Sequence, residues 1–243
     1  MKTVLFISLL FFVHTASAEC KKDFSTLGAE YSIAHSKAHA KQTENKEHLN
    51  LWRLPKRVGH EHVEQKRFIE WMQAGTKKIR KTDYFDANKR GIEYYPEDLE
   101  EREAQSDWSI YNQFITEEFI ASLSPVNTVG KGCDTLVSYQ GSKQNAKFEL
   151  TWFPHKKIIQ SFTILTPTLI TEWKLEKLHS DQTMIKQQFA QRSQYQLTDY
   201  ADIGDNESDP FLLSMINLGF VKHGASGFYN AQGESMDGGH HHH

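Results

Sequence analysis

Histidines are the residues of this chain whose type and spacing most readily suggest chemistry. The sequence contains 13 of them, and imidazole is a ligand that zinc, copper and nickel accept in proteins. Two pairs lie near the start of the chain and a run of four closes it. These residues are His35 and His39, His60 and His62, and His240, His241, His242 and His243. The pattern predicts a transition-metal site for zinc or copper.

The spacing of the two pairs decides which side chains could act together. On a helix, residues four apart such as His35 and His39 lie on one side, and on a strand residues two apart such as His60 and His62 share a face. No established zinc signature, such as His-Glu-x-x-His or Cys-x-x-Cys, occurs in the sequence. Solvated surface histidines are therefore the competing interpretation. The final four are either native or an expression tag, and in both cases they bind divalent metal.

The first 18 residues have the pattern of a secretory signal peptide. A positive start is followed by an apolar run from Val4 to Val13 and by Ala16-Ser17-Ala18, the small-residue pattern that signal peptidase cleaves. The apolar run is shorter than the roughly 20 residues that span a membrane, and no later stretch approaches that length. We expect an exported chain, periplasmic or secreted, cleaved after Ala18 and without an integral membrane span.

Two cysteines, Cys20 and Cys133, are present. In an oxidising compartment an even pair usually forms a disulfide. The sequence therefore predicts that these two residues are bonded.

An acidic stretch suggests a cation site or a helix cap. Asp205, Glu207 and Asp209 imitate the first three alternating ligands of a calcium loop. Position six of such a loop would be Pro210 and position twelve Ile216, so an EF-hand is excluded. The alternative is that these acids stabilise the start of the helix that follows.

The sequence offers no catalytic motif. It contains no Gly-x-Ser-x-Gly, no Ser-x-x-Lys and no phosphate-binding glycine loop, so a hydrolase would have to lack any recognisable motif. The 28 basic and 31 acidic residues leave a net charge of -3. This balance argues against nucleic acid as a partner, because such binding needs a basic surface.

Alternating apolar and polar residues predict strands in two sets. Residues 24–47, in contrast, are polar and show little periodicity, which predicts a weakly helical lead-in. The predicted strands are residues 67–72, 79–85 and 92–95 in the first set, and residues 136–139, 148–152, 158–165 and 169–178 in the second.

Three helices are expected around these strands. One covers residues 106–123, with Ser106 as its cap; the others are residues 181–191 and a segment from Asp209 to Gly219, with Pro210 at its first position. The predicted fold class is α+β: a mainly antiparallel sheet of half-barrel-like meanders, one covering helix and two C-terminal helices. The expected organisation along the chain is a signal peptide (1–18), a lead-in (19–48), a single domain (49–229) and a flexible tail (230–243).

The strand pattern from residue 49 to 178 resembles in outline the half-barrel of periplasmic lipoprotein and lipid carriers, although no diagnostic motif accompanies it. That resemblance implies a concave face that holds acyl chains. The sequence thus predicts an exported binding or accessory protein whose ligand is a metal ion held by histidines, or alternatively a small apolar or lipid-like molecule. A hydrolase is the remaining alternative.

Overall fold

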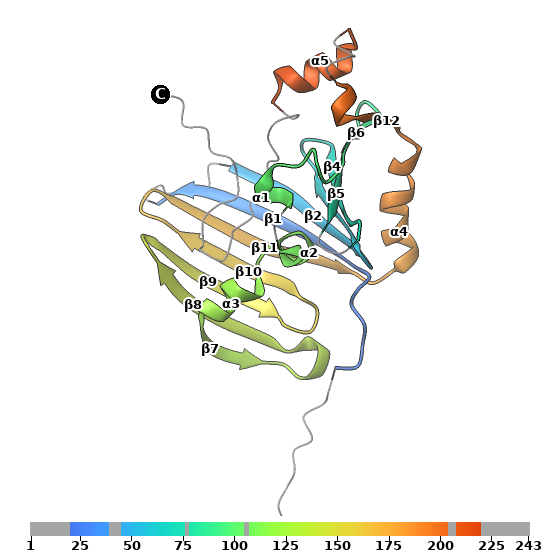
Figure 1. Ribbon diagram of the computed structural model, residues 1–243. Helices are drawn as coiled ribbons and strands as arrows, with labels where there is room; N and C mark the ends of the chain where they lie inside the picture. The colour runs from blue at the N-terminus through green and yellow to red at the C-terminus, as the bar shows by residue number, and fades with distance from the viewer. Residues whose placement is uncertain (1–19, 39–44, 76–77, 105–106, 204–207, 220–243) are drawn as a thin grey trace, which may run out of the picture.

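The computed structural model describes residues 20–38, 45–75, 78–104, 107–203 and 208–219. Its main feature is one sheet of 12 strands in the order β12-β6-β5-β4-β3-β2-β1-β11-β10-β9-β8-β7 (Figure 1). Neighbouring strands are antiparallel, except that β12 runs parallel to β6. The strands are β1 Leu27–Lys37, β2 Asn45–Leu54, β3 Arg57–His62, β4 Arg67–Gln73, β5 Ile79–Phe85, β6 Arg90–Tyr94, β7 Ser124–Val129, β8 Leu136–Lys143, β9 Ala146–Phe153, β10 Ile158–Leu165, β11 Leu169–His179 and β12 Gln196–Asp199.

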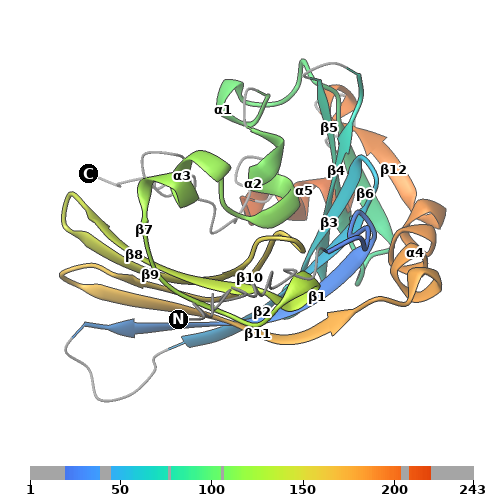
Figure 2. The ribbon, with the colours of Figure 1, turned by 90° about the horizontal axis from the view of Figure 1, so that it is seen from below.

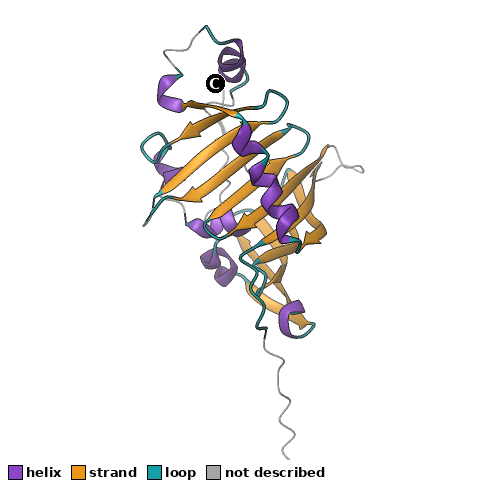
Figure 3. Cartoon of the chain, turned by 90° about the vertical axis from the view of Figure 1, so that its right-hand side faces the viewer, coloured by secondary structure: helices purple, strands orange, loops and turns teal. Residues whose placement is uncertain are grey.

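The sheet bends, as twisted sheets of this size do, and helices lie on both of its sides. Figure 2 shows α1 (Glu101–Ala104), α2 (Trp108–Gln113) and α3 (Glu117–Ser122) in the angle between the two halves of the sheet. We call these three the lid helices and the sheet surface that they cover the inner face. Helix α4 (Gln182–Ala190) lies across the strands on the outer face (Figure 3), and α5 is Pro210–Asn217.

The main core lies between the inner face and the lid helices. Every second residue of β1 points to it, because successive side chains of a strand alternate between faces. Residues from both predicted strand sets share this core with residues of β1, including Leu27, Ala29, Tyr31, Ile33, Ile69, Trp71, Phe148, Leu150, Phe162 and Trp173. The prediction of an α+β protein built on an antiparallel sheet is confirmed in these broad terms.

A smaller cluster forms under α4. Its members are Trp52, Phe68 and Tyr84 from the sheet with Ile185 and Phe189 from the helix. The predicted helix at 181–191 is confirmed: Asp181 caps it by accepting hydrogen bonds from two backbone N–H groups. Phe189 is thus a buried aromatic residue in a cluster separate from the inner face.

The prediction of a single covering helix over residues 106–123 is wrong. The chain forms two six-residue helices there, α2 and α3. Helix α2 ends at Phe114, whose backbone is left-handed (φ 68°), and Thr116 then caps α3 by accepting from the N–H of Phe119. Asp107 caps α2, and Ser106 lies outside the described residues.

The prediction of a helical lead-in over residues 19–48 is also wrong for those residues of the segment that the structure describes. Residues 27–37 form β1, which pairs with β2 on one side and with β11 on the other. Its inward positions alternate with small or polar ones such as Ser32 and Ala34, so the apolar contrast in the sequence is weak. Strands β2, β3, β7 and β12 have no counterpart among the predicted strands.

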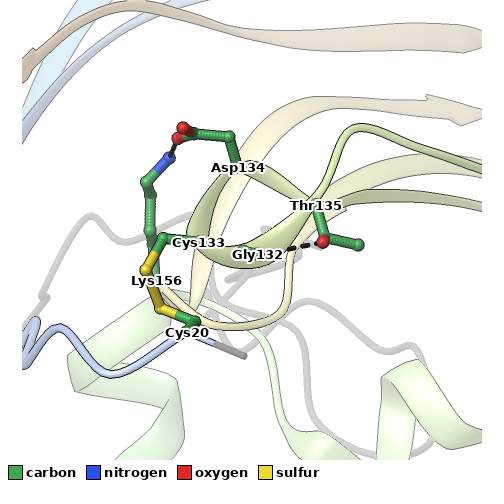
Figure 4. The surroundings of a disulfide bond; sticks show 6 residues. All are labelled: Cys20, Gly132, Cys133, Asp134, Thr135 and Lys156. Atoms are coloured by element: carbon green, nitrogen blue, oxygen red, sulfur yellow. Dashed lines mark hydrogen bonds and ion pairs between the residues drawn. A yellow bond between two sulfur atoms is a disulfide. The ribbon is translucent and has the colours of Figure 1, made fainter. Parts of the chain in front are cut away.

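The predicted disulfide between Cys20 and Cys133 is confirmed (Figure 4). The two Cα atoms lie 4.6 Å apart, and 113 positions separate the residues in the sequence. The bond fastens the segment before β1 to the short turn that precedes β8. Beside it, Lys156 Nζ donates to Asp134 Oδ1 at 2.5 Å.

Candidate functional site: the inner face and its lid

Aromatic side chains form the contact between the lid and the sheet. Phe114, in the link between α2 and α3, inserts its ring between Tyr31 of β1 and Trp173 of β11, with ring centroids 5.8 Å and 5.2 Å away. Only 1% of Phe114 is exposed. A bulky residue in a left-handed conformation is strained, and such strain is found at sites that switch or bind. Phe114 is therefore a plug held at an energetic cost.

Helix α3 adds a second aromatic contact further along the inner face. The ring of Phe119 packs edge-on against Phe148 of β9 at 5.2 Å and near Phe162 of β10 at 5.9 Å. Together with the Phe114 contact, this makes a continuous apolar surface across several strands. Such a surface has the chemistry to hold hydrocarbon, since burial of apolar area is the dominant favourable term in binding it.

A few polar contacts fasten the lid helices to the sheet. Nε2 of His60 lies 2.7 Å from the carbonyl oxygen of Tyr111. A neutral imidazole donates its N–H to that oxygen. Arg53 donates to the carbonyl of Asn112 at the end of α2. Lys81 Nζ on β5 lies 2.9 Å from Oε1 of Glu103, which belongs to α1. The lid is thus held by separate contacts along its length.

Several buried polar atoms on the inner face and on α2 lack a hydrogen bond within the part of the chain that the structure describes, and two of them concern the contact of α2 with β4. These two are the indole Nε1 of Trp71 on β4 and the amide Oε1 of Gln113 on α2. An unsatisfied buried polar group costs roughly 1–3 kcal/mol. The closed lid is accordingly less stable than its apolar contacts alone would make it.

His60 and His62 share the inner side of β3, as the sequence predicted, but they are not solvated. They are 1% and 9% exposed, so the competing surface interpretation is wrong for this pair. Desolvation lowers the pKa of His60 to about 4. Desolvation, followed by the nearby charge of Arg67, lowers the pKa of His62 to about 3. Both histidines are neutral near pH 7.

Arg67 and Asp83 form a buried ion pair beside these histidines. Arg67 Nε donates to Asp83 Oδ1 at 2.7 Å, and both side chains are almost fully inaccessible. The two opposite charges cancel, so the pair adds no net charge to the inner face and no open ligand position. Breaking such a pair leaves an uncompensated buried charge, which is strongly destabilising.

His35 lies apart from the other histidines. It belongs to β1, so the helical argument that joined it to His39 does not hold, and its Nε2 lies 3.3 Å from Glu47 Oε1. In the described ranges, no group of three or more His, Cys, Asp or Glu side chains could hold a metal ion. His39 and His240–His243 lie outside those ranges. The zinc or copper site therefore stays a prediction, as does the hydrolase alternative.

The acidic candidates are only partly described. Asp209 caps α5, since its Oδ1 accepts from the N–H of Phe211, and its Oδ2 accepts from Arg90 at 2.8 Å. Asp205 and Glu207 lie outside the described residues. Asp209 thus acts as a helix cap with an arginine partner.

Sequence reasoning did not single out Phe114, Arg53 or Lys81. Their roles depend on which strand lies beneath which lid helix, and that pairing carries no local signal. None of the helices in the described part of the chain has both the length and the apolar character needed to cross a membrane.

Comparison with known proteins gives distant structural likenesses. No protein-family model and no curated protein matches the chain. PNGF-II is 11% identical with a TM-score of 0.35, over 71% of this chain and 31% of its own, so the chain spans about a third of that protein. A domain described as a putative outer membrane lipoprotein-sorting protein domain from Vibrio parahaemolyticus is 7% identical, with a TM-score of 0.31. The match covers 69% of this chain and 92% of that domain. MucB, in complex with MucA(peri), is 8% identical, with a TM-score of 0.28. The match covers 65% of this chain and 53% of MucB. Likenesses this weak carry no argument about function.

Proposed function

We propose that the protein is an exported carrier that holds an apolar, acyl-chain-like ligand between the inner face and the lid helices. One observation carries this proposal: the aromatic core of the inner face is closed by three short helices whose central link, Phe114, is a strained and buried plug. In this account the structure is the closed form, and the ligand takes the place of the plug.

Opening the lid requires little loss of secondary structure. Helices of four and six residues, such as α1, α2 and α3, have almost no stability of their own and depend on their packing. Moving them would relieve the left-handed strain at Phe114 and expose Trp71 Nε1 and Gln113 Oε1 to water. These gains offset part of the apolar contact that opening breaks.

An acyl chain can replace that contact. Each buried methylene contributes about 0.8 kcal/mol, so a chain that spans the rings of Tyr31, Trp173 and Phe162 recovers the apolar burial that the lid gives up. The aromatic walls favour a flexible hydrocarbon without requiring a particular head group.

Truncating the plug is expected to strengthen binding of a neutral apolar probe. Phe114→Ala removes the ring that the ligand must displace, and burial of such a ring contributes about 1.5–3 kcal/mol. We expect the affinity for lauryl alcohol to rise about tenfold, equivalent to about 1.4 kcal/mol. Calorimetric titration, with the fluorescence of the adjacent Trp173 as a second signal, measures the change.

Phe189→Ala is the matched control, because Phe189 is also buried but belongs to α4 on the outer face. It should lower stability and leave the probe affinity unchanged. Phe114→Leu, a milder truncation, gives an intermediate affinity and keeps the test valid if the alanine variant does not fold. The proposal fails if the native protein and the Phe114 variants do not bind the alcohol, or if Phe189→Ala has the same effect.

A further inference from the structure

A pocket of about 380 Å³ lies at one end of the inner face. Its walls come from the segment before β1, the turn between β2 and β3, the turn between β9 and β10, and α2. The disulfide at Cys20 fixes the first of these walls, two residues before Lys22. The pocket therefore lies where the edge of the lid meets the ends of the strands.

Cations dominate this pocket. Its lining contains Lys22, Arg53, Lys56, His155, Lys156 and Lys157, and Asp23 is the one carboxylate among the lining residues. Two carboxylates just outside it pair with Lys156 and Lys157: Asp134 at 2.5 Å and Glu117 at 2.9 Å. Lys22 and Lys56 form no ion pair with the described residues, although Lys22 lies over the ring of Phe24 at 5.5 Å. The pocket thus keeps an excess of positive charge.

Arg53 is a buried cation without a counter-ion. It is 3% exposed, and its guanidinium donates to the backbone carbonyls of Asn112, Lys156 and Lys157. Among the described residues, no carboxylate pairs with it. A buried charge is costly unless it is paired. An anion in the pocket would supply the missing charge.

The same arginine links the pocket to the lid over the apolar inner face. Arg53 donates to the carbonyl of Asn112, two residues before the plug Phe114, whose ring contacts Tyr31 at 5.8 Å. Through Asn112, Arg53 thus contacts the end of α2. A molecule with a charged end in the pocket would therefore have its chain directed beneath the lid helices.

We propose that this basic pocket binds the anionic head group, a carboxylate or phosphate, of the ligand whose chain occupies the inner face. The proposal rests on the carrier function above and narrows the ligand class to anionic amphiphiles. Lys22 and Lys56 supply exposed positive charge, and Arg53 supplies buried positive charge, while its N–H groups donate to backbone carbonyls.

The test compares laurate with lauryl alcohol, which has the same chain and no charge. Laurate should bind the native protein about tenfold more tightly, because each screened lysine contact contributes about 0.2–1 kcal/mol. In the double variant Lys22→Gln/Lys56→Gln this advantage should disappear, while the affinity for lauryl alcohol stays unchanged. The control is Lys89→Gln, since Lys89 is exposed and left-handed like Lys56 but lies in the turn between β5 and β6; it should retain the advantage.

Each outcome separates the head-group proposal from the carrier proposal. If the alcohol binds but laurate binds no more tightly, or if the lysine variant keeps the laurate advantage, the head-group proposal is wrong and the carrier function stands. If neither amphiphile binds, the carrier function fails and the head-group proposal fails with it. Inorganic phosphate is the third probe: competition with laurate but not with the alcohol supports the proposal. Binding of phosphate without binding of either amphiphile would show a free-anion site and overturn it.

Discussion

Acidification from pH 7 to pH 5 is expected to lower the free energy of unfolding by about 4 kcal/mol, through His60 and His62 alone. Their pKa values in the fold, about 4 and about 3, lie below the value of about 6.5 in the unfolded chain. The unfolded state therefore binds protons first as the pH falls. The stability that the neutral histidines provide is complete above pH 6.5 and is lost progressively below it.

The groups around the pair explain why protonation is resisted. Arg67 is close enough to His62 to disfavour a second positive charge. His60 is enclosed by Phe114, at 4.9 Å between ring centroids, and by the carbonyl of Tyr111. Glu64 is the one nearby carboxylate that favours the charged form of His62, and desolvation outweighs it.

Urea unfolding at several pH values measures this effect. The double variant His60→Gln/His62→Gln should lose most of the pH dependence between pH 7 and pH 5, while His155→Gln, at an exposed turn position, should keep it. An equally steep loss of stability in the double variant would contradict the assignment. Because His60 also fastens the lid through Tyr111, the protection factors of α2, corrected for the slower intrinsic exchange at low pH, should fall over the same acid range before global unfolding.

Removal of the disulfide is expected to cost about 4–5 kcal/mol. Cys20 and Cys133 are 113 positions apart, and for a loop of this size the chain-entropy account gives a stabilisation of that order. The variant Cys20→Ser/Cys133→Ser should show the loss in urea unfolding. Reduction of the native protein should reproduce it, because both treatments break the same bond.

Alkylation gives an independent check of the same bond. The oxidised protein should take up no label before reduction and two labels after it. Labelling of both cysteines without reduction, or a stability loss below about 1 kcal/mol in the double variant, would contradict the structural role of the bond.

The sequence predicts well those elements that have a local cause. Strand β10 at 158–165 follows from its alternation, and α4 and α5 follow from their caps, Asp181 and Asp209. The disulfide follows from an even pair of cysteines in an exported chain. In each case the determining residues are within a few positions of one another or are the only ones of their kind.

The parts that the sequence does not predict depend on distant contacts. Strand β1 pairs with β11, so that Ile33 lies opposite Trp173, and its small outward residues hide its period. The break at Phe114 is fixed by the rings of β1 and β11 beneath it. The basic pocket joins Lys22, Arg53, Lys56 and the turn at 155–157 from separate segments, so no spacing in the sequence marks it.

Native mass spectrometry of the protein purified without added metal or lipid tests the central claim most directly. The carrier account predicts a species heavier than the bare chain by the mass of one amphiphile, removed by solvent extraction and restored by laurate. A bare chain that stays unchanged after incubation with laurate would contradict the account. A mass increment of zinc or copper alone would contradict it as well, and would favour the histidine-based metal hypothesis.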